Sequence, residues 1–66
     1  MQIQVKCYAG WRGEETPRTL VLPDREVFVK SIEKRWRTPD FRYFKVLAAD
    51  GRTYRLKYDG QQWELI

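Results

Sequence analysis

Hydrophobic and polar side chains alternate along much of this chain, and a period of two is typical of half-buried β-strands rather than helices. The alternation covers residues 2–8 and returns in residues 18–22. The turn signal Pro23-Asp24 follows at once, and proline has no N–H to give to a sheet. The pattern therefore predicts two strands in the first third of the chain.

Residues 26–37 predict a third strand with one irregularity, because the inward positions change parity once before Ile32. A β-bulge near Lys30 and Ser31 accounts for that change and places Trp36 in the core together with Ile32. An amphipathic helix over the same residues is the alternative. The β-branched and aromatic residues and the lack of a capping box favour the strand.

The C-terminal residues 41–66 contain two Asp-Gly pairs that separate three alternating runs. A three-residue loop over residues 49–51, with Gly51 in the left-handed conformation, places Val46 opposite Tyr54 and keeps each face of the sheet chemically uniform. A two-residue loop would mix core and charged residues on one face. The sequence therefore predicts a glycine bulge at Gly51.

The second Asp-Gly pair predicts a two-residue loop, Asp59-Gly60, which places Leu56 opposite Trp63. A register with Ile32 opposite Val46 keeps the same faces together between the third and fourth strands. On this assignment Trp63 and Trp36 both belong to the core, and replacing either by alanine is expected to unfold the domain.

The strand pattern predicts an all-β fold, a small antiparallel, five- to six-stranded, partly open SH3-like barrel formed by residues 1–66 as a single domain. A chain of 66 residues with 42% apolar residues builds one tight core and has no room for a second domain or a large enclosed cavity.

Composition limits the chemistry of this chain. There is no histidine, Cys7 is the only cysteine and Ser31 the only serine, so we expect no disulfide, metal site, cofactor or catalytic nucleophile, and a domain that is not an enzyme. The parity of Cys7 favours a buried inert thiol over a reactive one. The reduced cysteine and the lack of a secretory signal or membrane-spanning run predict a cytoplasmic protein with no membrane partner.

The net charge of +4 favours polyanionic partners such as nucleic acid. On the predicted outer side of the sheet, one row places each base next to one acid, which favours a structural role: Glu33, Lys45, Arg55 and Glu64. The next row carries cations and an aromatic ring without an acid: Arg35, Tyr43, Lys57 and Gln62. Cations attract phosphates and a tyrosine stacks on a base. The predicted nucleic-acid-binding residues are Arg35, Arg37, Tyr43, Lys57 and Arg12.

Residues 9–16 form a connection that is long for a hairpin, and long loops in compact domains are often functional. Trp11 has the profile of an anchor for a protein partner, with Glu14 and Glu15 beside it. The alternative is that Trp11 folds inward and plugs an open end of the barrel. Adjacent carboxylates on an extended chain point apart, so catalysis by Glu14 and Glu15 is not expected.

Three segments carry a family resemblance: YAGWRGEETPR, EKRWRTPD and YFKVLAADGRTYRL. With them the chain resembles a family of short prokaryotic cytoplasmic proteins to which no activity is assigned, over about residues 5–65. The resemblance implies an SH3-like or related all-β domain and transfers no catalytic role. A fainter likeness to a small domain attached to relatives of translesion DNA polymerases favours nucleic acid as the partner.

The sequence therefore predicts a small non-enzymatic binding module that holds a nucleic-acid backbone on a basic and aromatic sheet face. The alternative is a protein- or peptide-interaction domain that uses the Trp11 loop, as SH3 barrels receive peptides, although the tyrosine motif and tryptophan pair of that family are missing. A monomer or a weak homo-oligomer is expected, the latter through pairing of the first strand's edge.

Overall fold

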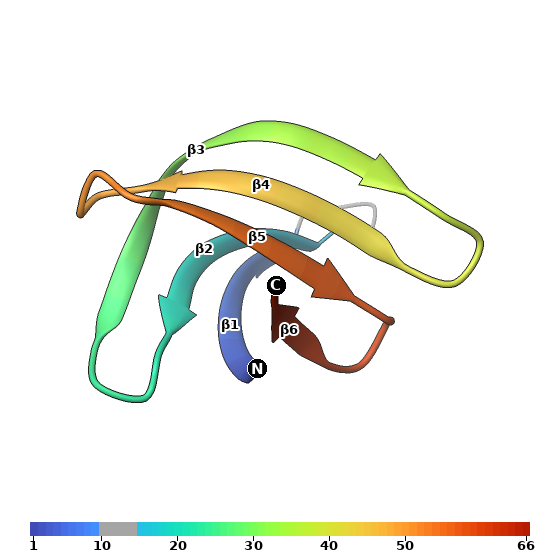
Figure 1. Ribbon diagram of the computed structural model, residues 1–66, viewed down its shortest axis with the longest axis horizontal. Coiled ribbons are helices and arrows are strands. Elements are labelled where there is room, and N and C mark those ends of the chain that lie inside the picture. Colours follow the sequence, from blue (N-terminus) through green and yellow to red (C-terminus); the bar gives the residue numbers. More distant parts are fainter. Residues whose placement is uncertain (10–14) are drawn as a thin grey trace.

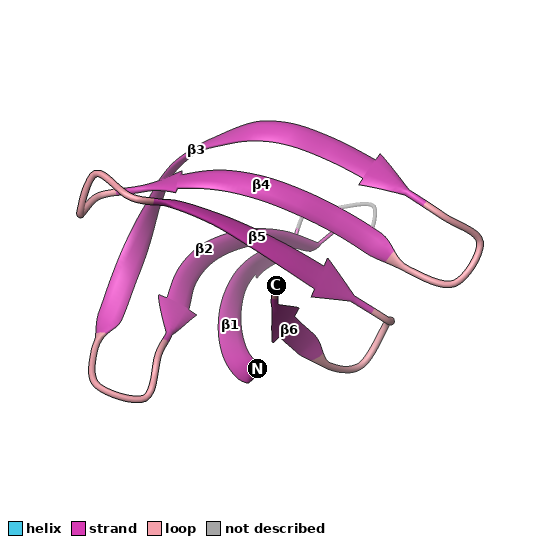
Figure 2. Ribbon diagram, viewed as in Figure 1, coloured by secondary structure: helices cyan, strands magenta, loops and turns pink. Residues whose placement is uncertain are grey.

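The computed structural model describes residues 1–9 and 15–66, apart from the side chains of Tyr8, Ala9 and Glu15. Six strands follow one another with no helix in the described residues (Figures 1 and 2). They are β1 (Gln2–Ala9), β2 (Glu15–Val21), β3 (Glu26–Arg37), β4 (Arg42–Ala48), β5 (Thr53–Tyr58) and β6 (Trp63–Leu65). Each strand pairs antiparallel with the next, which confirms the predicted small all-β, SH3-like barrel.

The barrel is closed by β1, which pairs with β6 as well as with β2. Ile3 lies opposite Trp63, and the N–H of Leu65 donates to the carbonyl oxygen of Met1 at 2.7 Å. The two ends of the chain consequently lie close together at the middle of Figure 1. We expected a partly open barrel, and the short β1–β6 pairing closes it instead.

Strand β3 is long and strongly bent, and it belongs to both halves of the barrel (Figure 1). It pairs with β2 over residues 26–28 and with β4 from Val29 onwards. Along its second half, no other described strand pairs with its free edge. This geometry turns the outer end of the β3–β4 hairpin away from the barrel.

Two bulges explain the bend of β3. The first register shift, between Val29 and Ser31, is the predicted one, and Ile32 lies opposite Val46 as expected. The second lies between Ile32 and Lys34 and was not predicted. It inverts the parity of everything beyond it, so Trp36 lies on the outer face with 37% of its surface exposed. The prediction of Trp36 as a core residue was wrong for this reason.

The hairpin of β4 and β5 has the predicted register. Val46 lies opposite Tyr54, and the N–H of Ala48 donates to the carbonyl oxygen of Arg52 at 2.9 Å across a three-residue loop. Gly51 closes this loop with a φ of 84°, which is the left-handed region that favours glycine. The predicted glycine bulge is therefore confirmed.

The hairpin of β5 and β6 is shifted by two residues from the predicted register, since Leu56 lies opposite Leu65 rather than Trp63. Asp59 accounts for the difference. One of its carboxylate oxygens accepts the N–H groups of Gln61 at 2.8 Å and Gln62 at 2.7 Å, so it flanks the turn instead of occupying it. Gly60 then takes the first turn position with a φ of 100°.

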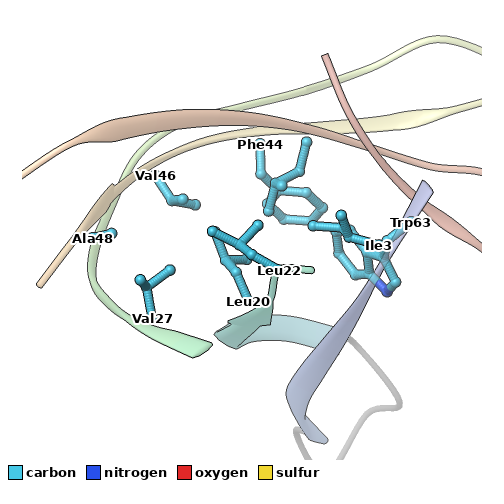
Figure 3. Packing of buried hydrophobic residues seen from close by; sticks show 9 residues of the cluster. Ile3, Leu20, Leu22, Val27, Phe44, Val46, Ala48 and Trp63 are labelled. Carbon is cyan, nitrogen blue, oxygen red and sulfur yellow. The ribbon is translucent and has the colours of Figure 1, made fainter. Parts of the chain in front are cut away.

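The core gathers inward side chains from all six strands (Figure 3). It consists of Ile3, Leu20, Leu22, Val27, Phe44, Val46, Ala48, Leu56 and Trp63. Trp63 belongs to the core, as predicted, and is 6% exposed. Its ring lies 5.4 Å from that of Phe44 and stacks on Tyr58 with centroids 4.3 Å apart. Aromatic packing of this kind adds about 0.5–1.5 kcal/mol per pair to the burial itself.

A polar cluster ties the β2–β3 turn to the β4–β5 turn. Arg25 donates to the hydroxyl oxygen of Tyr54 at 3.0 Å, and that hydroxyl donates to Asp50 at 2.8 Å. Asp50 also accepts the N–H of Arg52 at 2.9 Å, within its own loop. The cluster fixes the end of the barrel that lies opposite the outer end of the β3–β4 hairpin.

Candidate nucleic-acid interface

The outer face is the side of β3, β4 and β5 turned away from the core, carrying Lys34, Trp36, Tyr43, Lys45, Arg55 and Lys57. Its first feature is a cationic row. Lys34 lies opposite Lys45, which in turn lies opposite Arg55. Among the described residues, no carboxylate lies within ion-pair distance of these three side chains. Neighbouring strands are about 4.8 Å apart, so three cationic residues stand side by side across roughly 10 Å.

This row replaces the alternating row of acids and bases predicted from the sequence. The second bulge of β3 leaves Glu33 without a cross-strand partner and puts Lys34 opposite Lys45. The shifted β5–β6 register moves Glu64 away from Arg55 to Lys57. Neither expected acid is therefore a cross-strand partner in this row, whose three paired positions are all cationic.

An aromatic pair lies directly beside the cationic row. Trp36 and Tyr43 face each other across β3 and β4, with ring centroids 5.3 Å apart and planes inclined by 5°. Tyr43 stacks on the Trp36 ring, and β3 has no partner strand along its other edge in the part of the chain described here. The Nζ of Lys34 lies over the Trp36 ring, 5.4 Å from its centroid. The indole therefore combines an exposed aromatic surface with an adjacent positive charge.

Lys57 lies in the same row as the aromatic pair, opposite Tyr43, but its charge is partly neutralised. Its Nζ lies 3.1 Å from a carboxylate oxygen of Glu64 and 4.6 Å from the ring centroid of Phe41. Such contacts hold the side chain against the protein. Lys57 is thus a weaker candidate for a phosphate contact than Lys45 or Arg55.

Arg35 and Arg37 do not share a face with Tyr43, although the sequence predicted one stripe. The second bulge of β3 turns them to the inward-facing side, where Arg35 lies opposite Phe44 and Arg37 opposite Arg42. Both are exposed, because β3 extends there beyond the core. The structure therefore brings together Tyr43 and Lys57 from the predicted set and places the two arginines on the other side of the sheet.

The remaining predicted residues lie outside the description. Arg12, Trp11 and Glu14 fall in residues 10–14, and of Glu15 only the backbone is described, where it opens β2 opposite Ala9. The predictions made for this loop are neither supported nor opposed by the structure.

The sequence analysis did not predict four residues of the outer face as binding residues: Lys34, Trp36, Lys45 and Arg55. The parity of a strand is visible in a sequence only where apolar residues mark one face. Around Glu33 both neighbouring faces carry charged residues, so no signal reveals the second bulge. A tryptophan also fits either face, because its ring is apolar and its N–H is polar.

A cleft of about 800 Å³ is lined by residues of the β3–β4 turn and the β5–β6 turn. Both turns lie at the right of Figure 1. We call this feature the tip cleft, and it is lined by Arg37, Thr38, Pro39, Asp40, Phe41, Arg42, Tyr58, Asp59 and Gly60. The N–H groups of Gln62 and Gln61 hold the pKa of Asp59 below its ordinary value, so this carboxylate is charged at neutral pH. Tyr58 donates its hydroxyl hydrogen to the carbonyl oxygen of Gly60 at 2.8 Å.

Other kinds of site have little support in the described residues. No cluster of three or more potential metal ligands occurs among them. Cys7 is half-buried, with its sulfur 3.8 Å from the carbonyl oxygen of Val5. Residues 1–9 and 15–66 contain no helix with the length and hydropathy needed to cross a bilayer.

Comparison with known proteins yields no match to a family model, a curated protein or a solved structure. The resemblance to a prokaryotic family therefore stays a prediction.

Proposed function

We propose that this protein is a small, non-enzymatic module that binds single-stranded nucleic acid on its outer face. The phosphate backbone lies along the cationic row, and a base stacks on the exposed indole of Trp36. The observation that carries the proposal is the uninterrupted row of Lys34, Lys45 and Arg55 beside the aromatic pair.

The cationic row is unfavourable for folding by itself, because like charges directly opposite each other in a sheet destabilise the pair. Lys45 is flanked by a cation on both sides. No carboxylate of the described residues offsets this repulsion by an ion pair. A polyanion bound across the row would remove the repulsion, and it would release counterions from its own backbone.

The aromatic pair favours a single strand over a duplex. In a duplex the base faces are covered by neighbouring bases, whereas an unpaired base offers a face to an aromatic ring. Trp36 is already held in place by Tyr43, at a ring distance of 5.3 Å, so little freedom of the indole is lost when a base stacks on it. Stacking of this kind is sequence-tolerant, since every base has a π-face.

A titration of fluorescently labelled single-stranded DNA and RNA at low and at moderate salt tests the proposal. We expect saturable binding at low salt that weakens steeply as salt rises, and weaker binding to the matching duplex. Absence of saturable binding to either single strand at low salt would refute it.

A nucleic-acid partner also fits the cytoplasmic location suggested by the lone cysteine. Binding of a protein through the Trp11 loop remains a separate prediction. A contact centred on a tryptophan would change little with salt, so the same titration, repeated with a captured protein partner, separates the two functions.

A further inference from the structure

The tip cleft contains a second pair of like charges, on the side of the sheet opposite the cationic row. Arg37 and Arg42 lie directly opposite each other on β3 and β4, and both line the cleft. Their side chains are exposed and form no ion pair within the described part of the chain. Two arginines in this position repel each other, which costs stability unless an anion lies between them.

Guanidinium groups suit oxyanions such as phosphate, because each presents several N–H donors in one plane and pairs with two oxygens at a time. Two aromatic residues, Phe41 and Tyr58, also line the cleft. A volume of about 800 Å³ falls in the range that receives small organic ligands. The ligand that fits these features carries one phosphate and one flat ring.

Two carboxylates also line the cleft, and they limit where the phosphate can lie. The pKa of Asp59 is held low by the N–H groups of Gln62 and Gln61, which bind its carboxylate. Asp40 is exposed and makes no ion pair with Arg37 or Arg42 in the described chain. A bound phosphate would therefore be drawn toward the two arginines and repelled by Asp40.

We propose that the tip cleft is a nucleotide site, in which Arg37 and Arg42 hold one phosphate and the ring packs against Tyr58 and Phe41. The nucleotide is either free or part of a strand whose neighbouring residues lie on the outer face. Phe41 supports the second source, because it lines the cleft while its ring also lies 6.2 Å from that of Tyr43 on the outer face. This second source rests on the proposed function, whereas the first is independent of it.

Adenosine monophosphate and adenosine are suitable probes, with binding followed by NMR shifts of the arginine and tyrosine side chains. We expect the monophosphate to shift Arg37, Arg42 and Tyr58, and adenosine to shift them far less. Arg42→Gln should weaken binding of the monophosphate roughly tenfold, because a charge-assisted pair is lost. Asp40→Asn should strengthen it, since a repelling charge is removed. A site that was only structural would show no such opposite effects.

The same variants with a labelled oligonucleotide distinguish the two sources. If Arg42→Gln weakens binding of the oligonucleotide and of the monophosphate alike, the cleft holds one nucleotide of the bound nucleic-acid strand. If Arg42→Gln weakens binding of the monophosphate alone, the cleft binds free nucleotide. If Lys45→Gln also leaves binding of the oligonucleotide unchanged, the proposed function is wrong, whereas the nucleotide site in the tip cleft is still supported. The proposal is overturned if neither probe responds to Arg42→Gln or Asp40→Asn.

Discussion

Lys45 occupies a costly position in the sheet, since cationic residues flank it on both neighbouring strands. A residue kept for stability alone would be neutral or acidic there. If Lys45 serves binding, its replacement should change stability and nucleic-acid affinity in opposite directions. The stability of the fold should increase, and the affinity should decrease.

Replacing Lys45 by glutamine therefore has a predicted sign for each property. We expect the melting temperature to stay the same or rise, because the repulsion from Lys34 and Arg55 is relieved. Affinity for a single-stranded oligonucleotide should fall several-fold, and the slope of log K against log salt should become less steep by about 0.7, the value of one lost phosphate contact. Thermal unfolding and fluorescence titration measure the two effects.

Lys6→Gln is the charge-matched control, because Lys6 lies on β1 and pairs with Glu26 at 2.9 Å, away from the outer face. It should leave the binding affinity almost unchanged and lower stability by at most about 1 kcal/mol, as expected for an exposed ion pair. Equal loss of binding in both variants would mean that only net charge matters.

Trp36 and Trp63 have opposite roles despite their identical side chains. Trp63→Ala should lower the free energy of unfolding by about 3–5 kcal/mol, enough to unfold so small a domain, because it empties a core position that is 6% exposed. Trp36→Ala should cost about 1 kcal/mol, the value of its stacking on Tyr43. That variant should remain folded by circular dichroism and lose oligonucleotide affinity about tenfold. A folded Trp36→Ala protein with full affinity would exclude the indole as a stacking surface.

Strand β3 shows how far this fold can be predicted from its sequence. The bulge after Val29 is visible because apolar residues on both sides of it mark the buried face. The bulge at Glu33 is not, since Glu33, Lys34 and Arg35 are charged and fit either face. The extra residue of this bulge moves Arg35 to the inward-facing side and Trp36 to the outer face. The outer face therefore carries a tryptophan where the sequence predicted an arginine.

The two hairpin turns show the same limit. The register at Gly51 could be predicted because only one loop length keeps the two faces uniform. At Asp59 two registers that differ by two residues satisfy this condition equally well. The hydrogen bonds of the Asp59 carboxylate to the turn decide between them, and hydrophobic pattern contains no information on such bonds.

Gly51 should tolerate substitution poorly although there is space for a side chain. An added Cβ meets no atom within 4 Å, but the φ of 84° is strained for any residue with a Cβ. Gly51→Ala should therefore lower stability by about 1–2 kcal/mol, and Gly51→Asn by less, because asparagine adopts this conformation more readily. Urea unfolding measures both. Equal losses from the two variants would point away from backbone strain.

The polar cluster at the β4–β5 turn predicts how stability depends on pH. The N–H of Arg52, the Tyr54 hydroxyl and the Arg25 guanidinium hold the pKa of Asp50 below its ordinary value of 3.8. A carboxyl group with a lowered pKa in the folded state stabilises the fold above its ordinary pKa, and this contribution is lost as the pH falls through the lowered value. The urea midpoint should therefore fall below about pH 4.

Two variants check the assignment to Asp50. Asp50→Asn should be less stable than the original protein at neutral pH and should show a smaller further loss on acidification. Tyr54→Phe removes the 2.8 Å hydrogen bond from the hydroxyl to Asp50. The acid dependence of its stability should therefore lie between those of the original protein and Asp50→Asn. Identical acid dependence in all three proteins would assign the effect to other carboxyl groups.

The barrel as a whole separates the parts that stabilise it from the parts available for binding. Its core and its β1–β6 closure lie on one side of β3, β4 and β5, whereas the cationic row and the aromatic pair lie on the other. The tip cleft lies at the free end of the same strands. This arrangement lets the binding residues change without disturbing the packing. The cationic row and the arginine pair of the tip cleft lie on opposite faces of the same β3–β4 hairpin.

The salt dependence of single-stranded oligonucleotide binding tests the central claim most directly. Log K should fall linearly with log salt, with a slope of about −2 to −3, because three or four cations each contribute about 0.7 on a single strand. A slope near zero, or no saturable binding at the lowest salt concentration, would contradict the account of the outer face as a nucleic-acid interface.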